Sequence, residues 1–183
     1  EEWFARHARG EPGAFERLVG HYHGPIQAYL ARCGLNAIER DDLSQEIFLR
    51  LHASAARYHP SRPARVWVFT IAANCARSFF RRRRVRNRTP AHEHLPPPSP
   101  LPGAADVHEA QQTAQRLQWA LERLPLVQRE VVLLHTLQSM GIAQIAQTLG
   151  LPDGTVKTHL HRGRLALAKC MARAEAAALR EQG

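Results

Sequence analysis

A proline-rich segment near the middle of the chain limits the possible folds more than any other feature of the sequence. It reads NRTPAHEHLPPPSPLPGAADV, from Asn87 to Val107. Each proline removes a backbone N–H donor and disfavours a helical conformation in the residue before it, so the PPPSPLP core cannot form a helix. Its polyproline preference makes such a segment extended. The sequence therefore predicts an N-terminal domain of residues 1–86, a flexible linker of residues 87–112 and a C-terminal domain of residues 113–183.

The N-terminal domain shows the three- and four-residue periodicity of amphipathic helices. Apolar residues recur in this way from Phe15 to Leu30, and in IERDDLSQEIFLRLHASAARY they include Leu43, Ile47 and Phe48. A third block, PARVWVFTIAANCARSFFRRRR, also has helical character. No two-residue alternation typical of a strand competes with these patterns.

The C-terminal domain shows the same periodicity in shorter pieces. It begins with AQRLQWALERL, after which Pro125 suits the first turn of a second helix, LVQREVVLLHTLQ. Two further pieces, GIAQIAQTLG and DGTVKTHLHRGRLALAKCMARAEAAA, are joined by LGLP, whose glycine suits a helix C-terminus and a tight turn. Two helices joined this closely predict a helix-turn-helix. The expected fold class is all-α, with two small helical domains and a proline-rich linker between them.

In a helix-turn-helix, the second helix lies in the DNA major groove with its N-terminal residues against base edges. Val156 and Leu160 are expected to pack against the first helix, which leaves the polar residues outside. An ordinary helical hairpin with a solvated basic face is the alternative. Gly163 weakens the helix by roughly 1 kcal/mol relative to alanine, and it either lets the backbone approach a phosphate or is simply tolerated. The candidate DNA contacts are Thr155, Lys157, Thr158, His161, Arg162 and Arg164.

The third block of the N-terminal domain belongs to a long basic window. No acidic residue occurs between Glu46 and Glu93, whereas RSFFRRRRVRNR alone holds four consecutive arginines. The formal net charge of the chain is +9, and a field of one sign repels itself unless a polyanion neutralises it. Aromatic residues among the arginines suit stacking with unpaired bases. Trp67 is expected to face the core, and Phe69 is the better candidate for exposure.

The sequence does not support other classes of site. The histidine pairs in HYH and HEH lack a carboxylate or thiolate cluster at a known ligand spacing, and no phosphate-binding glycine loop or nucleophile elbow occurs. We expect no enzymatic activity, no cofactor and no metal site. Cys33, Cys75 and Cys170 are odd in number and widely spaced, which indicates free thiols in a reducing compartment.

No stretch approaches the roughly 18 to 20 apolar residues of a membrane span. The acidic start EEW lacks the basic and apolar regions of a signal peptide. Membrane insertion is therefore not expected, and the cytoplasm is the predicted location.

Both halves of the chain resemble one protein family. DDLSQEIFLRLHASAARYHPSRPARVWVFTIAANCARSFFRRRR is similar to the second conserved region of sigma factors of bacterial RNA polymerase, and LERLPLVQREVVLLHTLQSMGIAQIAQTLGLPDGTVKTHLHRGRLAL to their fourth. With only the linker between these regions, the chain resembles a group IV, extracytoplasmic-function (ECF) sigma factor of the sigma-70 family. The resemblance implies a dissociable subunit that binds the β′ and β subunits of core RNA polymerase and promoter DNA, and that directs promoter-specific initiation. It also implies control by an anti-sigma factor.

The resemblance assigns roles to particular residues. The DDLSQEIF helix would contact the β′ subunit; stabilisation of a helix N-terminus by Asp41 and Asp42 is the alternative. The loop YHPSRPAR and the helix after it would capture a flipped base of the −10 element, and the helix-turn-helix would read the −35 element. The expected polymerase contacts are Asp41, Asp42, Gln45 and Glu46, and the expected −10 contacts are Ser61, Arg62, Arg65, Phe69, Thr70, Asn74, Arg77 and Arg81.

Some positions depart from the family pattern. Gly141 and Gln144 replace a common Ser or Thr cap and a following Glu, but both can still take part in capping. Thr158 and His159 replace a frequent Ser-Arg pair, which leaves the −35 sequence undetermined. The competing hypothesis is a LuxR-like helix-turn-helix regulator, in which TVKTHL also occurs. Such a regulator needs alternating strands and helices in its N-terminal half, and the sequence shows none.

Overall fold

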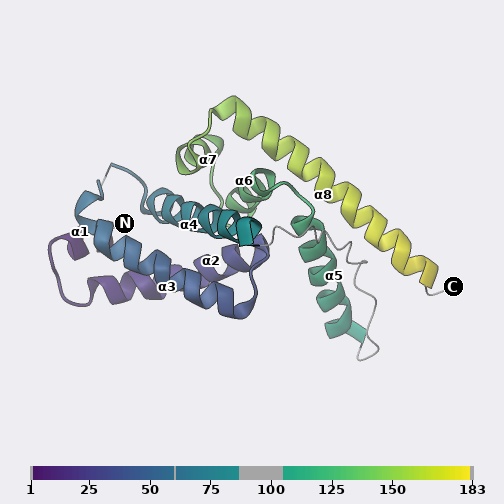
Figure 1. The fold of residues 1–183 in the computed structure, drawn as a ribbon, viewed down its shortest axis with the longest axis horizontal. Coiled ribbons are helices and arrows are strands. Elements are labelled where there is room, and N and C mark those ends of the chain that lie inside the picture. The colour runs from purple at the N-terminus through teal and green to yellow at the C-terminus, as the bar shows by residue number, and fades with distance from the viewer. Residues whose placement is uncertain (1, 60, 87–104, 182–183) are drawn as a thin grey trace.

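The computed structural model describes residues 2–59, 61–86 and 105–181, and in these ranges the regular structure is entirely helical, which confirms the expected all-α class (Figure 1). None of these helices is both long and apolar enough to cross a bilayer. The elements in the first half are α1 (Glu2–Ala8), α2 (Ala14–Cys33), α3 (Ala37–Ser54), the short 3-10 helix η1 (Ala55–Arg57) and α4 (Ala64–Arg86). Those in the second half are α5 (Ala105–Glu122), α6 (Leu126–Thr136), α7 (Ile142–Leu149) and α8 (Asp153–Glu181).

The first half is a bundle in which α3 packs against both α2 and α4. Its core contains Leu18, Ile26 and Ile47, all with no exposed side-chain surface. Helix α3 begins with a capping box: the Asn36 side chain accepts from the backbone N–H of Glu39 at 2.9 Å, and the Glu39 carboxylate accepts from the Asn36 N–H at 3.0 Å. These bonds satisfy N–H groups that have no partner inside a helix, so the start of α3 is fixed by two residues.

The second half contains the predicted helix-turn-helix, formed by α7 and α8. The Gln144 side chain accepts from the backbone N–H of Gly141 at 3.0 Å, so these two residues do take part in capping α7. Gly150 ends α7 with a φ of 66°, a left-handed conformation that favours glycine. Val156 and Leu160 are buried, as predicted from their spacing.

Helix α5 begins earlier than the sequence pattern suggested. It starts at Ala105, so a helix occupies residues 105–112, which were predicted to be linker. The PPPSPLP core falls within residues 87–104, outside the described part of the chain. The division into residues 1–86, 87–112 and 113–183 remains a prediction.

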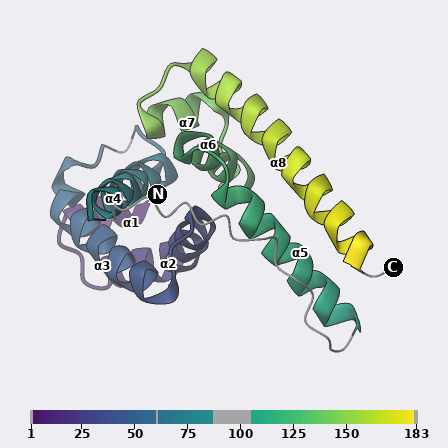
Figure 2. The same ribbon diagram turned by 45° about the vertical axis from the view of Figure 1, so that its right-hand side comes forward.

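The two halves of the described chain pack against each other. Helix α4 contacts α7, and α2 contacts α5 and α6. Buried side chains of both halves form one continuous cluster, which includes Phe69 from the first half and Leu134 and Ile145 from the second. Away from this contact, α5 and the C-terminal part of α8 extend beyond the other helices (Figure 2).

All three cysteines are free thiols. Cys33 and Cys75 are buried, and Cys170 is half-buried. Burial raises the pKa of Cys33 to about 12 and that of Cys75 to about 11. Both thiols are therefore protonated at neutral pH and chemically inert, because the thiolate is the reactive form.

Candidate nucleic-acid interface

Helix α4 and the loop before it carry the residues predicted to contact the −10 element. Two interactions join described residues of this loop: the Tyr58 hydroxyl donates to the carbonyl of Arg62 at 3.0 Å, and the Ser61 hydroxyl lies 2.8 Å from Nδ1 of His59. The Thr70 hydroxyl donates to the Val66 carbonyl within α4 at 2.7 Å. Of the eight candidates, five are exposed (Ser61, Arg62, Arg65, Asn74 and Arg81), two are half-buried (Thr70 and Arg77), and Phe69 is buried.

The exposure predicted for Phe69 is wrong. Its side chain has no exposed surface, and its ring packs edge-on against Tyr29, with 5.6 Å between the ring centroids. Trp67 is half-buried and packs against the core beside Tyr58, as expected. The reason is that α4 lies between α3 and α7 and is covered on two sides. A helix covered on two sides has no single apolar stripe from which exposure can be read.

Two of the predicted DNA contacts are bound to the second half of the chain. Arg65 donates through Nη1 to the carbonyl of Gln138 at 2.7 Å. The Nε of Arg77 donates to both carboxylate oxygens of Glu130, at 3.1 and 3.0 Å. Nη1 of Arg77 also lies 3.5 Å from the carbonyl of Leu149 in α7. These guanidinium groups therefore join the halves in this structure.

Glu130 is a functional candidate that the sequence reasoning missed. It lies in α6 within the run EVVLL, and its side chain has no exposed surface. The hydroxyl of Tyr29 lies 3.5 Å from its Oε1 atom. Burial raises the pKa of the Glu130 carboxyl, while Arg77 acts in the opposite direction. A carboxylate inside an apolar helix was the signal available in the sequence, because such a group requires a partner.

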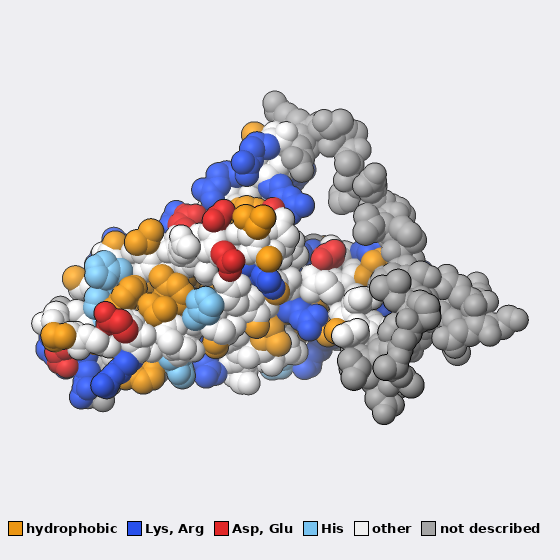
Figure 3. Space-filling model, turned by 90° about the horizontal axis from the view of Figure 1, so that it is seen from below, with side chains coloured by type: hydrophobic (Ala, Val, Ile, Leu, Met, Phe, Trp, Pro, Cys, Tyr) orange, Lys and Arg blue, Asp and Glu red, His pale blue; other side chains and the backbone are white. Residues whose placement is uncertain are grey.

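The arginine run at the end of α4 is not a field of one sign in the folded chain. Arg81 to Arg86 are exposed. However, Arg82 lies 3.7 Å from a carboxylate oxygen of Glu46, and Arg83 lies 3.6 Å from one of Glu39. Acidic side chains thus lie beside basic ones on this face of the molecule (Figure 3). The basic window in the sequence is partly neutralised by α3.

Helix α3 presents the residues predicted to contact core polymerase. Asp41, Asp42 and Gln45 are exposed, whereas Glu46 is half-buried and bound to Arg50 at 2.6 Å. The helix-terminus alternative does not hold for Asp41 and Asp42, because the acidic residue in the first turn is Glu39.

Apolar residues flank the acidic positions of α3. Ile38 is 75% exposed and Leu49 is 70% exposed. At steps of four, three and four residues, Ile38, Asp42, Gln45 and Leu49 share one face of the helix. We call these four residues the α3 stripe. Both apolar side chains of the α3 stripe are therefore open to solvent and accessible to a protein partner.

Helix α8 exposes most of the residues predicted to contact the −35 element. Lys157, Thr158, His161, Arg162 and Arg164 are exposed, and Thr155 is half-buried. The hydroxyl of Thr158 donates to the carbonyl of Gly154 at 2.9 Å, one turn earlier in the same helix. Neither explanation offered for Gly163 holds, because this residue is buried against α6.

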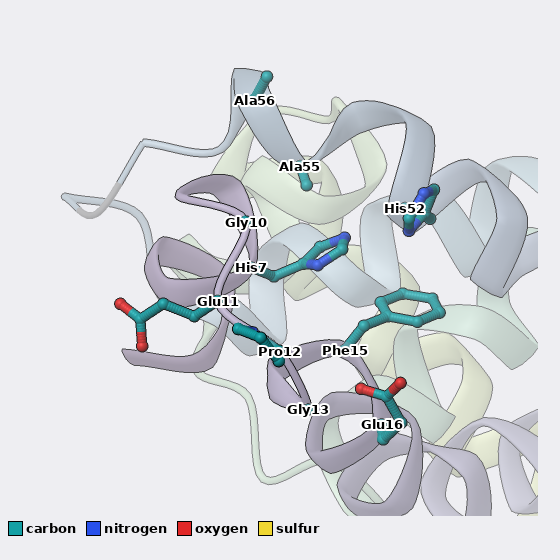
Figure 4. A pocket seen from close by; sticks show the side chains of 10 residues that line it. All are labelled: His7, Gly10, Glu11, Pro12, Gly13, Phe15, Glu16, His52, Ala55 and Ala56. Carbon is teal, nitrogen blue, oxygen red and sulfur yellow. The ribbon is translucent and has the colours of Figure 1, made fainter.

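A separate pocket of about 500 Å³ lies between the α1–α2 loop and the end of α3 (Figure 4). The rings of His7, Phe15 and His52 meet there, with centroids 4.8 to 5.0 Å apart. Burial, followed by the proximity of His52, lowers the pKa of His7, while Glu16 acts in the opposite direction. Within the described residues, no group of three or more His, Cys, Asp or Glu side chains is arranged to hold a metal ion.

Comparison with known proteins identifies the class to which this helical architecture belongs. The family model for Sigma-70 region 2 matches residues 18–86, and that for Sigma-70, region 4 matches residues 114–167. The RNA polymerase sigma factor CnrH of Cupriavidus metallidurans is 33% identical over 171 residues, 89% of each chain. The ECF RNA polymerase sigma factor RpoE of Cereibacter sphaeroides is 32% identical over 86% of this chain and 84% of its own.

Two solved structures share the fold. CnrH in complex with the cytosolic domain of CnrY has a TM-score of 0.71 and 23% identity, covering 93% of this chain and 96% of that one. The sigma factor RpoE in complex with the anti-sigma factor NepR from Bartonella quintana has a TM-score of 0.71 and 20% identity, covering 87% and 98%.

These matches place the chain among the transcription initiation factors of bacterial RNA polymerase. The chain belongs to the sigma-70 family, in its extracytoplasmic-function group. It is a dissociable polymerase subunit that directs promoter-specific transcription initiation, and the LuxR-like hypothesis is set aside.

Proposed function

We propose that three separate surfaces of this chain bind core polymerase, the −10 element and the −35 element. The observation that carries the proposal is the α3 stripe, because its side chains make no hydrogen bond or ion pair with the residues that the structure describes. Ile38 and Leu49 are more exposed than the other large apolar residues of the described chain, and they flank two polar residues at helical spacing. The stripe is the proposed site for the β′ subunit, with Asp41 and Glu46 at its edge. The β subunit is the second proposed polymerase partner.

The −10 surface is proposed to consist of the loop before α4 and the exposed side of α4. Ser61, Arg62 and Asn74 offer hydrogen-bonding groups to bases, and Arg81 offers a charge to phosphate. Arg65 and Arg77 become available to the −10 surface when their contacts with the second half are broken. Phe69 supports the surface from beneath and does not contact a base, because its ring is buried against Tyr29.

The −35 surface is proposed to be the N-terminal part of α8. Lys157, His161 and Arg164 share one exposed side of this helix at steps of four and three residues. Val156 and Leu160 anchor the adjacent side of the helix in the core of the second half. Thr155, Thr158 and Arg162 complete the set, and a helix presented in this way fits the major groove.

Control of the protein is proposed to come from an anti-sigma factor. The solved structure of RpoE from Bartonella quintana is a complex with one, named NepR, and it shares this fold. We further propose that the chain acts in the cytoplasm, where RNA polymerase is found, and that it has no catalytic activity, cofactor or metal of its own.

Run-off transcription with bacterial core polymerase and a promoter library tests the proposal. Wild-type protein is expected to start transcription at a defined subset of promoters, and a D42A/Q45A variant to start it weakly at the same promoters. Separate substitution of Lys157 and Arg164 by alanine is expected to change which −35 sequences are selected. Absence of initiation from every promoter, with folded protein in excess, would overturn the proposed function.

A further inference from the structure

A buried ion pair crosses the contact between the two halves of the chain. We infer that Arg77 and Glu130 form a latch that holds the polymerase-free chain closed, with Arg77 bound to a carboxylate in the place of a promoter phosphate. The inference that this ion pair holds the two halves together does not depend on any role of the chain in binding DNA. Its consequence for promoter binding rests on the proposed function of α4.

The Glu130 carboxylate is held by polar contacts from two side chains of the first half. Nε of Arg77 lies 3.1 and 3.0 Å from the two carboxylate oxygens, and the Tyr29 hydroxyl approaches Oε1 at 3.5 Å. Glu130 belongs to α6, whereas Tyr29 and Arg77 belong to α2 and α4. One carboxylate therefore ties the second half to two helices of the first. Glu130 has no exposed surface, so these donors replace water around its charge.

Other polar contacts also join the two halves of the chain. Nη1 of Arg65 donates to the carbonyl of Gln138 at 2.7 Å, and Nε2 of Gln118 donates to the carbonyl of Ala31 at 3.1 Å. The buried Arg129 donates to the carbonyl of Cys33. These three bonds end on backbone oxygens, so Arg77 with Glu130 is the charged pair among the interactions described between the halves.

Closure and promoter binding compete for the same groups. The Nε of Arg77 is engaged by Glu130, and the same guanidinium reaches the end of α7 through Leu149. Helix α7 packs directly on α4. A phosphate bound through Nε of Arg77 would have to displace the carboxylate, and DNA on that side of α4 would have to displace α7.

The buried carboxylate also makes the latch breakable. Burial raises the pKa of Glu130, which shows that its charged form is disfavoured there despite Arg77. Loss of the arginine would leave a buried charge without its main partner, and opening would return that charge to water. The latch therefore depends on both residues.

A charge swap tests the latch in the full-length chain without polymerase. The E130K variant places two cations against each other and should open the chain, seen as an increase in the radius of gyration by small-angle X-ray scattering. The R77E/E130K variant restores an opposite-charge pair and should return the radius to that of wild type. E16K is the matched control, because Glu16 is exposed on α2 and the charge change is the same.

Circular dichroism decides whether E130K remains folded. If its helix content falls, R77A serves instead, because the Arg77 side chain is half-buried and lies outside the apolar core. R77A is expected to open the chain, and R77A/E130Q to close it again, because position 130 then no longer carries a buried charge. A folded E130K or R77A chain as compact as wild type, or a swap variant that stays expanded, would overturn the latch.

DNA binding by the opened chain separates the latch from the proposed function. E130K retains Arg77, so it should bind a pool of random-sequence single-stranded oligonucleotides more tightly than E16K does. A gain of about tenfold is expected if about a tenth of the wild-type chain is open, because apparent affinity scales with the competent fraction. An expanded E130K chain with the DNA affinity of E16K would refute the promoter role of α4 and leave the latch intact.

Discussion

Gly163 of α8 lies so close to Val132 of α6 that a β carbon at position 163 would stand 2.8 Å from the Cγ2 atom of Val132. The same β carbon would stand 3.3 Å from the backbone carbonyl of Gln128, which cannot move aside as a side chain can. The glycine therefore sets how closely α8 approaches α6, and with it the position of the proposed −35 surface.

The first prediction concerns the packing of α8 on α6 at Gly163. Overpacking in G163A should cost about 1–3 kcal/mol, against a gain of about 1 kcal/mol in helix propensity, so a net loss of unfolding free energy of about 1 kcal/mol is expected. Urea unfolding followed by circular dichroism measures it. G154A is the matched control in the same helix, because a β carbon there meets nothing within 4 Å. A G163A chain at least as stable as wild type would show that the two helices adjust freely.

The second prediction concerns the arginine run. Arg82 and Arg83 are close to carboxylates of α3, whereas the structure shows no such partner for Arg81 or Arg84 among the described residues. In the holoenzyme, R81A/R84A should therefore weaken promoter binding more than R82A/R83A does. The slope of log affinity against log salt should become less negative by about 0.7 to 0.9 for each phosphate that the variant no longer binds.

Fluorescence anisotropy across a salt series checks this difference, and each double variant controls for the charge removed in the other. Replacement of all four arginines by alanine should flatten the salt dependence further. An unchanged slope in the fourfold variant would mean that the run does not touch phosphate.

The third prediction concerns the α3 stripe. D42A, Q45A and L49A should each weaken binding to core polymerase by about tenfold, equivalent to about 1.4 kcal/mol, because exposed groups at the centre of an interface carry much of its energy. Thermal unfolding should change little, since these side chains are exposed. E16A removes an exposed charge from α2 and should bind polymerase normally. Biolayer interferometry with core enzyme gives the comparison, and equal affinities for D42A and E16A would place the docking surface elsewhere.

The fourth prediction concerns pH and the pocket in Figure 4. The folded pKa of His7 lies below its ordinary value of 6.5, so the unfolded chain binds more protons as pH falls through 6.5. The contribution of His7 to stability is therefore present above that pH and is lost below it. His52 opposes the protonation of His7, and Glu16 favours it.

Urea midpoints at pH 7.5 and 5.5 test this sign. H7Q should lose less stability than wild type over that interval, because the glutamine does not titrate. H161Q removes an exposed imidazole from α8 and should behave like wild type. An identical pH response in H7Q and wild type would contradict the prediction.

Local features of the fold could be predicted because their causes are local. Helical periodicity located the apolar faces that bury Ile47, Val156 and Leu160, and the Gln144 side chain caps α7 by accepting from the backbone N–H of Gly141. The proline-rich segment predicted a division of the chain, which stays a prediction, and it did not indicate that α5 already begins at Ala105.

Local sequence patterns could not predict which residues mediate contact between the two halves. Phe69 was expected to be exposed because the sequence does not reveal that α4 is covered by α3 on one side and α7 on the other. Arg77 was predicted to be a DNA contact because the resemblance places it in the helix that would bind the −10 element. The folded chain instead supplies Glu130 as its partner, from a position 53 residues away. The sequence by itself determined the helices, the helix-turn-helix and the family, since these depend on short-range periodicity and recognisable motifs. Only the tertiary structure decided which guanidinium groups are free for DNA, because burying a charge depends on partners that are distant in the chain.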